Sequence, residues 1–461
     1  MAARVKLNEL SEEQKTLIRK YLCIQPKKTN FAVNKFSDVE KDPVLFYWID
    51  KPNNEIVLPY FFANSLMKRH INSELTYSPG KFNFTGKLRD YQLPAIEEAL
   101  KQLHTYGTTL LALPTAWGKS LSALYLASKL EGLVLVLTNR ETIQTGWATT
   151  LKENFDAGVW VVDSKMKIPE KCNVILTMDG KFDKIPYEIR KMVSTYIIDE
   201  LHLLTTSTRV PVLLGLQPKY IIGCTATLER PDGLEAMAYS MLGNHKVEVK
   251  NNKKFTVYKL NTGIETEMVK NKQGTIDFAA LTRSLAFDPK RNAIIVDLVV
   301  QNKNSKFMIL TWNKEHVQFL MNIFKEKGES VDILCGTKSK YIDSRILIGT
   351  MSKIAVGFDA ANSAVNWQNV CIDTLILTGS TKSHNMHIQS IGRVFRADNP
   401  TVIELIDKNR ISASHWRERK KNYEELNCEI KEFTLTGEVA EVNVQEMHAS
   451  RVKALQEKMK G

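Results

Sequence analysis

Short apolar runs rich in β-branched residues recur from about Tyr91 onward and constrain the fold more than any other feature of this chain. Amphipathic stretches of helical period separate them. Runs that read as buried strands lie at 108–113, 133–138, 173–177, 196–199 and 220–225, and again at 306–311, 330–335, 345–350, 374–378 and 401–407. This alternation is typical of parallel sheets covered by helices on both faces. We therefore predict an α/β protein with two successive five-strand lobes.

The chain has 461 residues, which is too long for one ordinary core. Its first part lacks the alternation and is expected to form a small accessory domain. The polar stretch 243–275, rich in Lys and Asn, is expected to carry the connection between the lobes. The predicted divisions are an N-terminal accessory domain at 1–84, a first lobe at 85–245, a second lobe at 246–430 and a charged tail at 431–461.

The formal net charge of +12 favours a polyanionic partner, with nucleic acid first and a membrane surface second. A basic protein without such a partner is equally compatible with this charge. The six cysteines form no C-x-x-C pair, which argues against a zinc site or a disulfide framework. The chain shows neither an apolar leader nor an apolar run of about 18 residues. We expect a soluble intracellular protein with no membrane partner.

Gly118-Lys119-Ser120 follows one predicted strand and opens an amphipathic helix, which is the context of a phosphate-binding loop. Backbone N–H groups at a helix start bind phosphate, a lysine adds a mobile positive charge, and a serine hydroxyl can ligate Mg²⁺. Leu113 stands where the usual pattern has its first glycine, so a helix start that merely contains this tripeptide is the alternative. Trp117 is expected to pack on the outer face of the loop rather than to stack on a base.

Asp199 and Glu200 end another predicted strand, in the segment "YIIDELH". An acid at such a strand end can hold Mg²⁺, and its neighbour can polarise an attacking water. A surface Asp-Glu pair is the alternative, but the upstream Gly-Lys-Ser segment favours the site. Together the two segments predict nucleotide hydrolysis with ATP and Mg²⁺.

Asp199-Glu200-Leu201-His202 resembles the DExH box of superfamily 2 helicases, and further motifs resemble that family in its order. They are "LRDYQ", "LTNRETIQTGW", "GCTATLERPDG", "LIGTMSKIAVGFD" and "QSIGRVFR". The forms of the phosphate loop and of the T-A-T-x-x-R-x-D-G motif are similar to the UvsW/XPB-like branch. The short first domain most resembles members from large DNA viruses, including the poxvirus transcript-release helicase. The resemblance covers both lobes and implies two tandem RecA-like lobes.

The resemblance also implies roles for particular residues. The catalytic set would be Lys119, Asp199, Glu200, Gln389, Arg393 and Arg396, with the two arginines reaching the γ-phosphate from the second lobe. The ATP-binding set would be Arg89, Gln92, Pro114, Thr115, Ala116, Trp117, Gly118, Lys119, Ser120, Gly357 and Asp359. Ser120 and Asp199 would hold Mg²⁺, while His202, Thr225 and Thr227 would couple hydrolysis to the nucleic-acid track. A solvated helix face is the alternative for Arg393 and Arg396.

Nucleic acid should contact both lobes mainly through its phosphates. Candidate contacts near strand ends are Thr138, Thr177, Thr311 and Thr350, although a strand-end threonine is more often structural. Trp147 and Trp312 are expected to pack in the cores rather than to stack on bases. The run at 417–421, "RERKK", is expected to be a solvated helix face.

Three rival functions remain open from the sequence. A translocase could release transcripts or displace proteins without separating strands, a non-catalytic scaffold could retain the fold, and a small-molecule P-loop kinase could use the phosphate loop. The choice between DNA and RNA, the polarity, the role of the first domain and further partners such as transcription or replication machinery are undetermined. We expect a monomer located in the cytoplasm, in a viral factory or virion if the chain is viral, with the nucleus also open.

Overall fold

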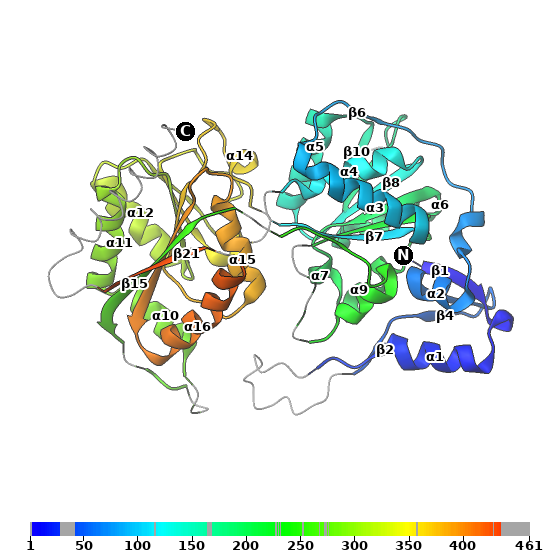
Figure 1. Ribbon diagram of the computed structural model, residues 1–461, viewed down its shortest axis with the longest axis horizontal. Helices are drawn as coiled ribbons and strands as arrows, with labels where there is room; N and C mark the ends of the chain where they lie inside the picture. Colours follow the sequence, from blue (N-terminus) through cyan, green and yellow to red (C-terminus); the bar gives the residue numbers. More distant parts are fainter. Residues whose placement is uncertain are drawn as a thin grey trace. The chain divides into compact units, whose positions relative to one another are not determined.

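The computed structural model describes residues 2–27, 42–114, 117–163, 168–225, 228, 230, 232–250, 253–266, 268–271, 274, 276–355, 358–426 and 428–434. The chain divides into two compact units, Met1–Lys250 and Asn251–Gly461 (Figure 1). Each unit is built around its own seven-stranded sheet. Among the described residues, no helix combines the length and the apolar character needed to cross a membrane.

The first sheet has the strand order β10-β11-β8-β12-β13-β7-β14, and all its neighbouring strands are parallel. The strands are β7 Thr108–Ala112, β8 Leu133–Thr138, β10 Val159–Val161, β11 Val174–Met178, β12 Val193–Ile198, β13 Tyr220–Thr225 and β14 Val247–Glu248. The helices that matter most below are α3 Leu93–Tyr106, α4 Lys119–Lys129, α5 Glu141–Asn154, α7 Leu201–Leu204 and α9 Glu235–Leu242. Parallel order places the carboxyl ends of these strands on one edge of the sheet.

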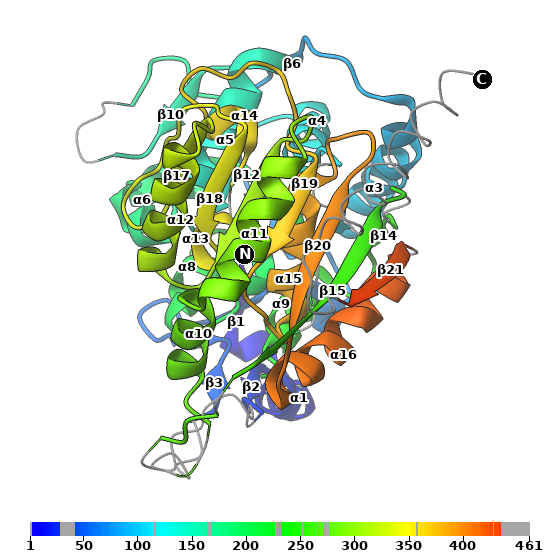
Figure 2. The ribbon, with the colours of Figure 1, turned by 90° about the vertical axis from the view of Figure 1, so that its left-hand side faces the viewer.

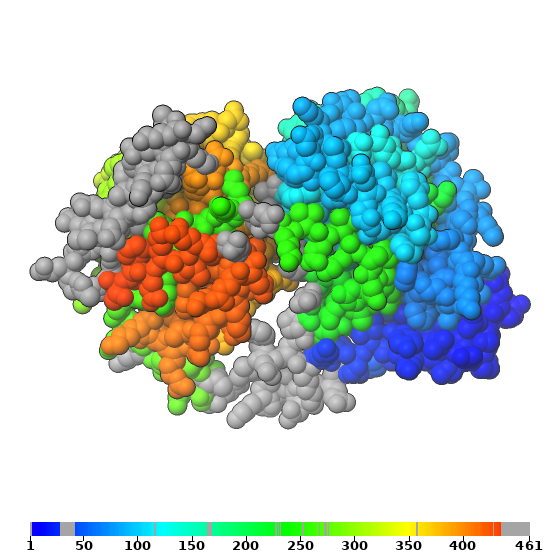
Figure 3. Space-filling model, in the orientation of Figure 1, coloured from blue at the N-terminus to red at the C-terminus, as the bar shows by residue number. Residues whose placement is uncertain are grey.

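The N-terminal segment forms a small antiparallel sheet of its own, in the order β1-β5-β4. Its elements are β1 Ala2–Lys6, α1 Glu12–Leu22, β4 Trp48–Asp50, β5 Glu55–Pro59 and α2 Tyr60–Met67. Val5 and Leu58 belong to the same buried cluster as Tyr196 of β12 and Met241 of α9. The fully buried Asn72 amide donates to the carbonyls of Ala2 and Pro218, at 2.9 Å each. The segment therefore shares a core with the first sheet, and its surface borders that of α9 (Figure 3).

The second sheet has the order β17-β18-β16-β19-β20-β15-β21, again with parallel neighbours. The strands are β15 Thr256–Glu265, β16 Phe307–Thr311, β17 Val331–Leu334, β18 Ile346–Thr350, β19 Thr374–Leu377, β20 Thr401–Lys408 and β21 Glu429–Thr434. Its helices include α10 Phe278–Ala286, α11 Pro289–Gln301, α12 Lys314–Glu326, α13 Met351–Ile354, α14 Ala360–Ser363, α15 His384–Ile391 and α16 Arg410–Glu425. When the strands of each sheet are numbered along the chain, both sheets have the order 3-4-2-5-6-1-7.

Helices cover both faces of the second sheet, so its strands are buried on both sides. Tyr258 of β15 packs in one cluster with α11 and α12, which lie together on one face (Figure 2). Val257, the residue before Tyr258 in β15, packs in a second cluster with α13, α15 and α16. This alternation follows from the period of two along a strand.

The predicted two-lobe α/β class is confirmed, but the expected five strands in each lobe are wrong. Both sheets gain strands for which no long apolar run is present: β10 and β14 in the first, β15 and β21 in the second. The strand β15 lies inside the stretch predicted to be a connection. Its burial alternates and is interrupted near its end, so it lacks the continuous apolar signal of a central strand.

The interpretation of 417–421 as a fully solvated face is also wrong for one residue. Arg419 is 3% exposed, and its Nε donates to both carboxylate oxygens of Glu404, at 3.0 and 2.8 Å. The Tyr423 hydroxyl donates to the same carboxylate at 2.6 Å. Burial alone would raise the pKa of Glu404, but the Arg419 guanidinium outweighs it and lowers the pKa to about 2. The charged run therefore contains one core ion pair between α16 and β20.

Replacing Glu404 by Ala should lower the free energy of unfolding by about 3–5 kcal/mol, because Arg419 would remain buried without its carboxylate. Urea denaturation measures this loss. The matched control is Glu424→Ala. It removes an exposed carboxylate of α16 that pairs with Lys420, and it should lower the free energy of unfolding by less than about 0.5 kcal/mol. Equal effects of the two substitutions would contradict the importance of the buried pair.

Candidate active site

The start of α4 has a backbone conformation that requires glycine. Gly118 caps the helix with φ 102° and ψ 34°, and a Cβ atom placed there would lie 2.6 Å from Nε2 of Gln92. The same Gln92 Nε2 donates to the carbonyl of Trp117 at 3.1 Å, and its Oε1 accepts from the backbone N–H of Arg89 at 2.9 Å. Gln92 therefore ties the segment before α3 to the loop before α4.

Lys119 is the first residue of α4, and its ammonium lies among acids. Its Nζ is 3.2 Å from Oε1 of Glu200, and both side chains are only 15% exposed. Burial favours the neutral amine, but Glu200 and Asp199 outweigh it and raise the pKa of Lys119. The lysine is thus held as a cation at a helix start, where positive charge and free N–H groups attract anions.

Asp199 follows the carboxyl end of β12, and two donors hold its carboxylate. Its Oδ2 accepts from the indole Nε1–H of Trp147 at 2.7 Å, and its Oδ1 accepts from the backbone N–H of Glu200 at 2.9 Å. Burial and the neighbouring Glu200 raise the pKa of Asp199, while Lys119 and the indole oppose that rise. Trp147 lies in α5 and is buried as the sequence predicted, but its contact with Asp199 was not predicted.

Glu200 is one of few non-glycine residues with a left-handed backbone, at φ 46° and ψ 50°. Such a conformation costs of order 1 kcal/mol or more and is concentrated at functional sites. Near it, His202 Nδ1 lies 2.9 Å from the Thr225 hydroxyl, so the turn after β12 is joined to the end of β13. Burial lowers the pKa of His202, which makes the imidazole neutral at pH 7.

Arg230 and Asp232 belong to this site but were not among the predicted site residues. The guanidinium of Arg230 donates to both oxygens of Asp232, at 2.8 and 2.6 Å, and also to the backbone carbonyl of His202. The pair thereby fastens the segment after β13 to α7. Both residues lie in the T-A-T-x-x-R-x-D-G motif, so the signal was present in the sequence.

The second unit holds the other predicted residues. Arg393 donates to the carbonyls of Ala355 and Phe358, and Arg396 pairs with Asp359. Both arginines thus contact the segment that follows β18. Asp359 also caps α14, because its Oδ1 accepts from the N–H of Asn362 at 3.1 Å. Gln389 is buried on α15.

The remaining predicted residues divide by burial. Thr138, Thr177, Thr311 and Thr350 are all buried, and three of them hydrogen-bond within the fold through their side-chain hydroxyls. Arg89 donates to the Tyr91 hydroxyl at 2.7 Å, and the rings of Tyr91 and Trp117 lie 5.6 Å apart. Pro114 and Ser120 are half-buried. The predicted site residues Thr115, Ala116, Thr227 and Gly357 lie outside the described residues.

Substituting Ala at Gly118 should lower the free energy of unfolding by about 1–3 kcal/mol, because Ala is strained at this φ and its methyl group meets Gln92. Thermal or urea denaturation measures the change. Gly180→Ala is the matched control, since a Cβ there meets nothing within 4 Å. A Gly118→Ala protein as stable as the control would contradict the strained loop.

The site can now be compared with known proteins. Residues 85–230 match the family described as "Type III restriction enzyme, res subunit". The helicase-named protein 161L of Invertebrate iridescent virus 6 is 28% identical over 382 residues, which cover 76% of this chain and 84% of that protein. The helicase-named protein 055L of Frog virus 3 is 27% identical over 353 residues, which cover 75% and 79%.

Among solved structures, Dbp5 of S. cerevisiae bound to RNA and ADP BeF3 has a similar fold. The TM-score is 0.52 and the sequence identity is 14%, over 74% of this chain and 89% of that one. At this identity the likeness shows the fold alone, and it confirms the predicted tandem RecA-like lobes. The family match over residues 85–230 and the helicase-named relatives support an ATP-hydrolysing helicase, the enzyme class that the sequence predicted.

Proposed function

We propose that this chain is a translocase or helicase of the UvsW/XPB-like, DExH-box branch that couples ATP hydrolysis to movement on DNA. The observation that carries the proposal is the Lys119 ammonium held between Glu200 and Asp199 at the start of α4. A cation beside two acids and free helix N–H groups can receive a phosphate chain and a metal ion together. The net charge of +12 supports a polyanionic track.

ATP with Mg²⁺ would supply the phosphoryl group that is transferred to water. In this proposal Gly118 and Lys119 hold the phosphates, and Ser120 with Asp199 holds the metal ion. Phosphate oxygens would compete with Glu200 for the lysine, which leaves the Glu200 carboxylate available to orient a water molecule. The donor set fits, since acids, a hydroxyl and helix N–H groups are gathered at one strand edge.

The proposal assigns the other predicted residues to binding and coupling. Arg89 and Gln92 would border the adenine, with the rest of the loop at 114–117 around the phosphates. Arg393, Arg396 and Gln389 would act on the γ-phosphate from the second lobe, beside the segment that holds Asp359 and Gly357. His202, Thr225 and Thr227 would transmit the state of the nucleotide to the nucleic-acid track.

The proposed nucleic-acid track follows the carboxyl ends of the strands near Thr138, Thr177, Thr311 and Thr350. Because these side chains are buried, main-chain N–H groups and exposed neighbours such as Arg140 are the better phosphate ligands. Binding should then be steeply salt-dependent and only weakly sequence-dependent.

Single-stranded DNA should stimulate ATP hydrolysis by the wild-type protein. Single-stranded RNA is compared with it at the same salt concentration. Lys119→Ala and Glu200→Gln should each abolish hydrolysis, the first by loss of phosphate binding and the second by loss of the water-orienting acid. Glu200→Gln should still bind a fluorescent ATP analogue. An ATPase rate that neither nucleic acid changes would favour the scaffold alternative over a translocase.

Replacing Trp147 by Phe removes the indole N–H that Asp199 accepts but keeps an aromatic ring in the core. We expect the Mg²⁺ concentration for half-maximal ATPase activity to rise several-fold, because the carboxylate loses one of its two orienting donors. The control is Trp160→Phe, whose buried indole does not contact the acids. An unchanged Mg²⁺ dependence would show that the indole only fills space.

A further inference from the structure

A hollow in the second unit lies at the carboxyl ends of β16, β19 and β20, apart from the residues assigned to ATP. Its inner wall includes Arg291, Thr311, Thr378 and Asp407, and its outer wall includes Phe278 and Trp312. We call it the second-lobe hollow. It encloses about 440 Å³, a volume that includes open solvent at its mouth.

The hollow occupies the position that corresponds to the candidate active site of the first unit. Because the two sheets share one strand order, β16, β19 and β20 correspond to β8, β12 and β13. Asp199 and Glu200 follow β12, as Thr378 follows β19. Lys119 begins the helix after the first strand of its sheet, and Arg291 lies in the first turn of α11. Carboxyl ends of parallel strands are where ligands bind in such sheets.

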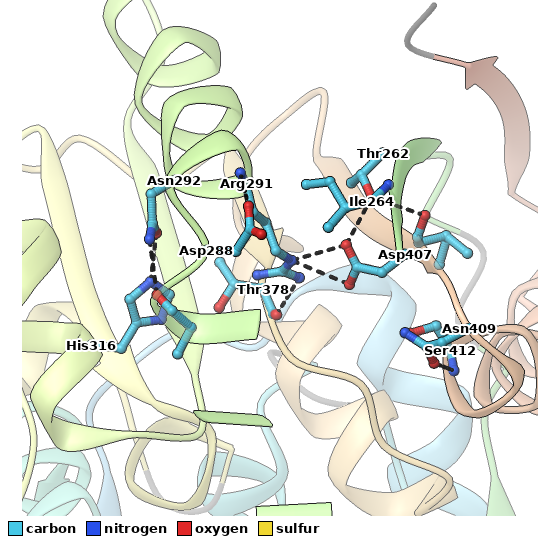
Figure 4. A network of polar contacts seen from close by, with 12 residues as sticks. Thr262, Ile264, Asp288, Arg291, Asn292, His316, Thr378, Asp407, Asn409 and Ser412 are labelled. Carbon is cyan, nitrogen blue, oxygen red and sulfur yellow. Dashed lines mark hydrogen bonds and ion pairs between the residues drawn. The ribbon is translucent and has the colours of Figure 1, made fainter. Parts of the chain in front are cut away.

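The polar chemistry of this position differs from that of the first unit. Arg291 is 1% exposed, and its Nε donates to both oxygens of Asp407, at 3.0 and 3.2 Å, while Nη2 donates to the Thr378 carbonyl at 2.6 Å (Figure 4). Its third nitrogen, Nη1, is buried without a hydrogen-bond partner. A guanidinium N–H that is buried without an acceptor is unfavourable, so a ligand oxygen that accepts from it is favoured.

Two features disfavour an anionic ligand here. The Asp407 carboxylate already balances the Arg291 charge, and the N-terminus of α11 is capped by Asp288, which accepts from the Arg291 backbone N–H at 2.8 Å. By contrast, Gly118 at the start of α4 makes no side-chain cap. The neighbouring His316 is also fixed as a neutral group, because burial and Arg291 lower its pKa to about 3. A neutral acceptor therefore suits Nη1 better than a phosphate does.

The mouth of the hollow is aromatic. Phe278, at the start of α10, is 38% exposed, and its ring meets that of Trp312 edge-on at 6.2 Å. The Trp312 indole N–H donates to the Ser380 carbonyl at 3.1 Å, and this hydrogen bond fixes the ring in place. An exposed phenyl ring beside a fixed indole forms a surface for a planar ring.

We propose that the second-lobe hollow binds a nucleobase. The ring lies against Phe278 and Trp312 at the mouth, and a carbonyl oxygen of the base is directed inward to accept from Arg291 Nη1. Thymine, uracil, cytosine and guanine carry such an oxygen, whereas adenine does not. The base can come from a bound strand, a source that rests on the proposed function, or from a free nucleotide.

The test compares two phenylalanines of the second unit. Phe278→Ala removes one aromatic ring from the mouth of the hollow. Phe319→Ala removes a ring that is similarly exposed, at 39%, but does not line the hollow. One arm measures the affinity for fluorescein-labelled oligothymidylate, oligoadenylate and an abasic oligomer by anisotropy. The other arm measures saturation transfer from the protein to thymidine monophosphate by NMR. Neither residue belongs to the proposed ATP site.

For a strand base, Phe278→Ala should weaken oligothymidylate binding by at least about fivefold. The loss should be smaller for oligoadenylate and absent for the abasic oligomer, while Phe319→Ala leaves all three unchanged. For a free nucleotide, Phe278→Ala should remove the saturation-transfer signal of thymidine monophosphate without changing strand binding. Either result supports the hollow as a base site.

The proposal is overturned if Phe278→Ala and Phe319→Ala have the same effect on oligomer affinity and on the saturation-transfer signal. It is also overturned if Phe278→Ala weakens binding of the abasic oligomer as much as binding of oligothymidylate. A wild-type protein that binds no strand and whose ATPase no strand stimulates would contradict the proposed function. The nucleotide arm would still decide the hollow in that case, so the two failures are distinguishable.

Discussion

The ion pair between Lys119 and Glu200 is the interaction on which the first unit's site depends. Buried ion pairs contribute little net stability, because desolvation offsets most of the attraction. Their presence at a strand edge is therefore better explained by chemistry than by folding. In the order β12-β13-β7 only β13 separates β7 from β12, so the helix after β7 and the acids after β12 meet at the same edge of the sheet.

Contacts from three elements hold Asp199 and the turn that follows it. Trp147 reaches Asp199 from α5, and Thr225 reaches His202 from the end of β13. Arg230 holds the backbone of His202 from the segment beyond β13. A displacement of any of these elements would move a group bonded to the acids or to the turn beside them.

The fold class and the strand–loop–helix context of Gly118-Lys119 could be predicted from the sequence because their signals are local. Central strands buried on both faces are continuous apolar runs, and Gly118-Lys119 is defined by its immediate neighbours. The strand β15 escaped prediction, since a strand whose burial alternates carries a weak pattern. The contact between Trp147 and Asp199 joins residues 52 positions apart, and the burial of Arg419 depends on Glu404 of another element. Neither is encoded in local spacing.

The two lobes share one strand order but treat the start of the corresponding helix differently. In the first, Gly118 leaves the helix N–H groups without a side-chain cap, so an external anion can complete them. In the second, Asp288 caps α11, and Asp407 neutralises Arg291. In the second lobe an internal carboxylate therefore balances the charge that would otherwise favour an external phosphate. If the second-lobe hollow binds a base as proposed, its unsatisfied guanidinium nitrogen and its aromatic mouth suit a neutral group rather than an anion.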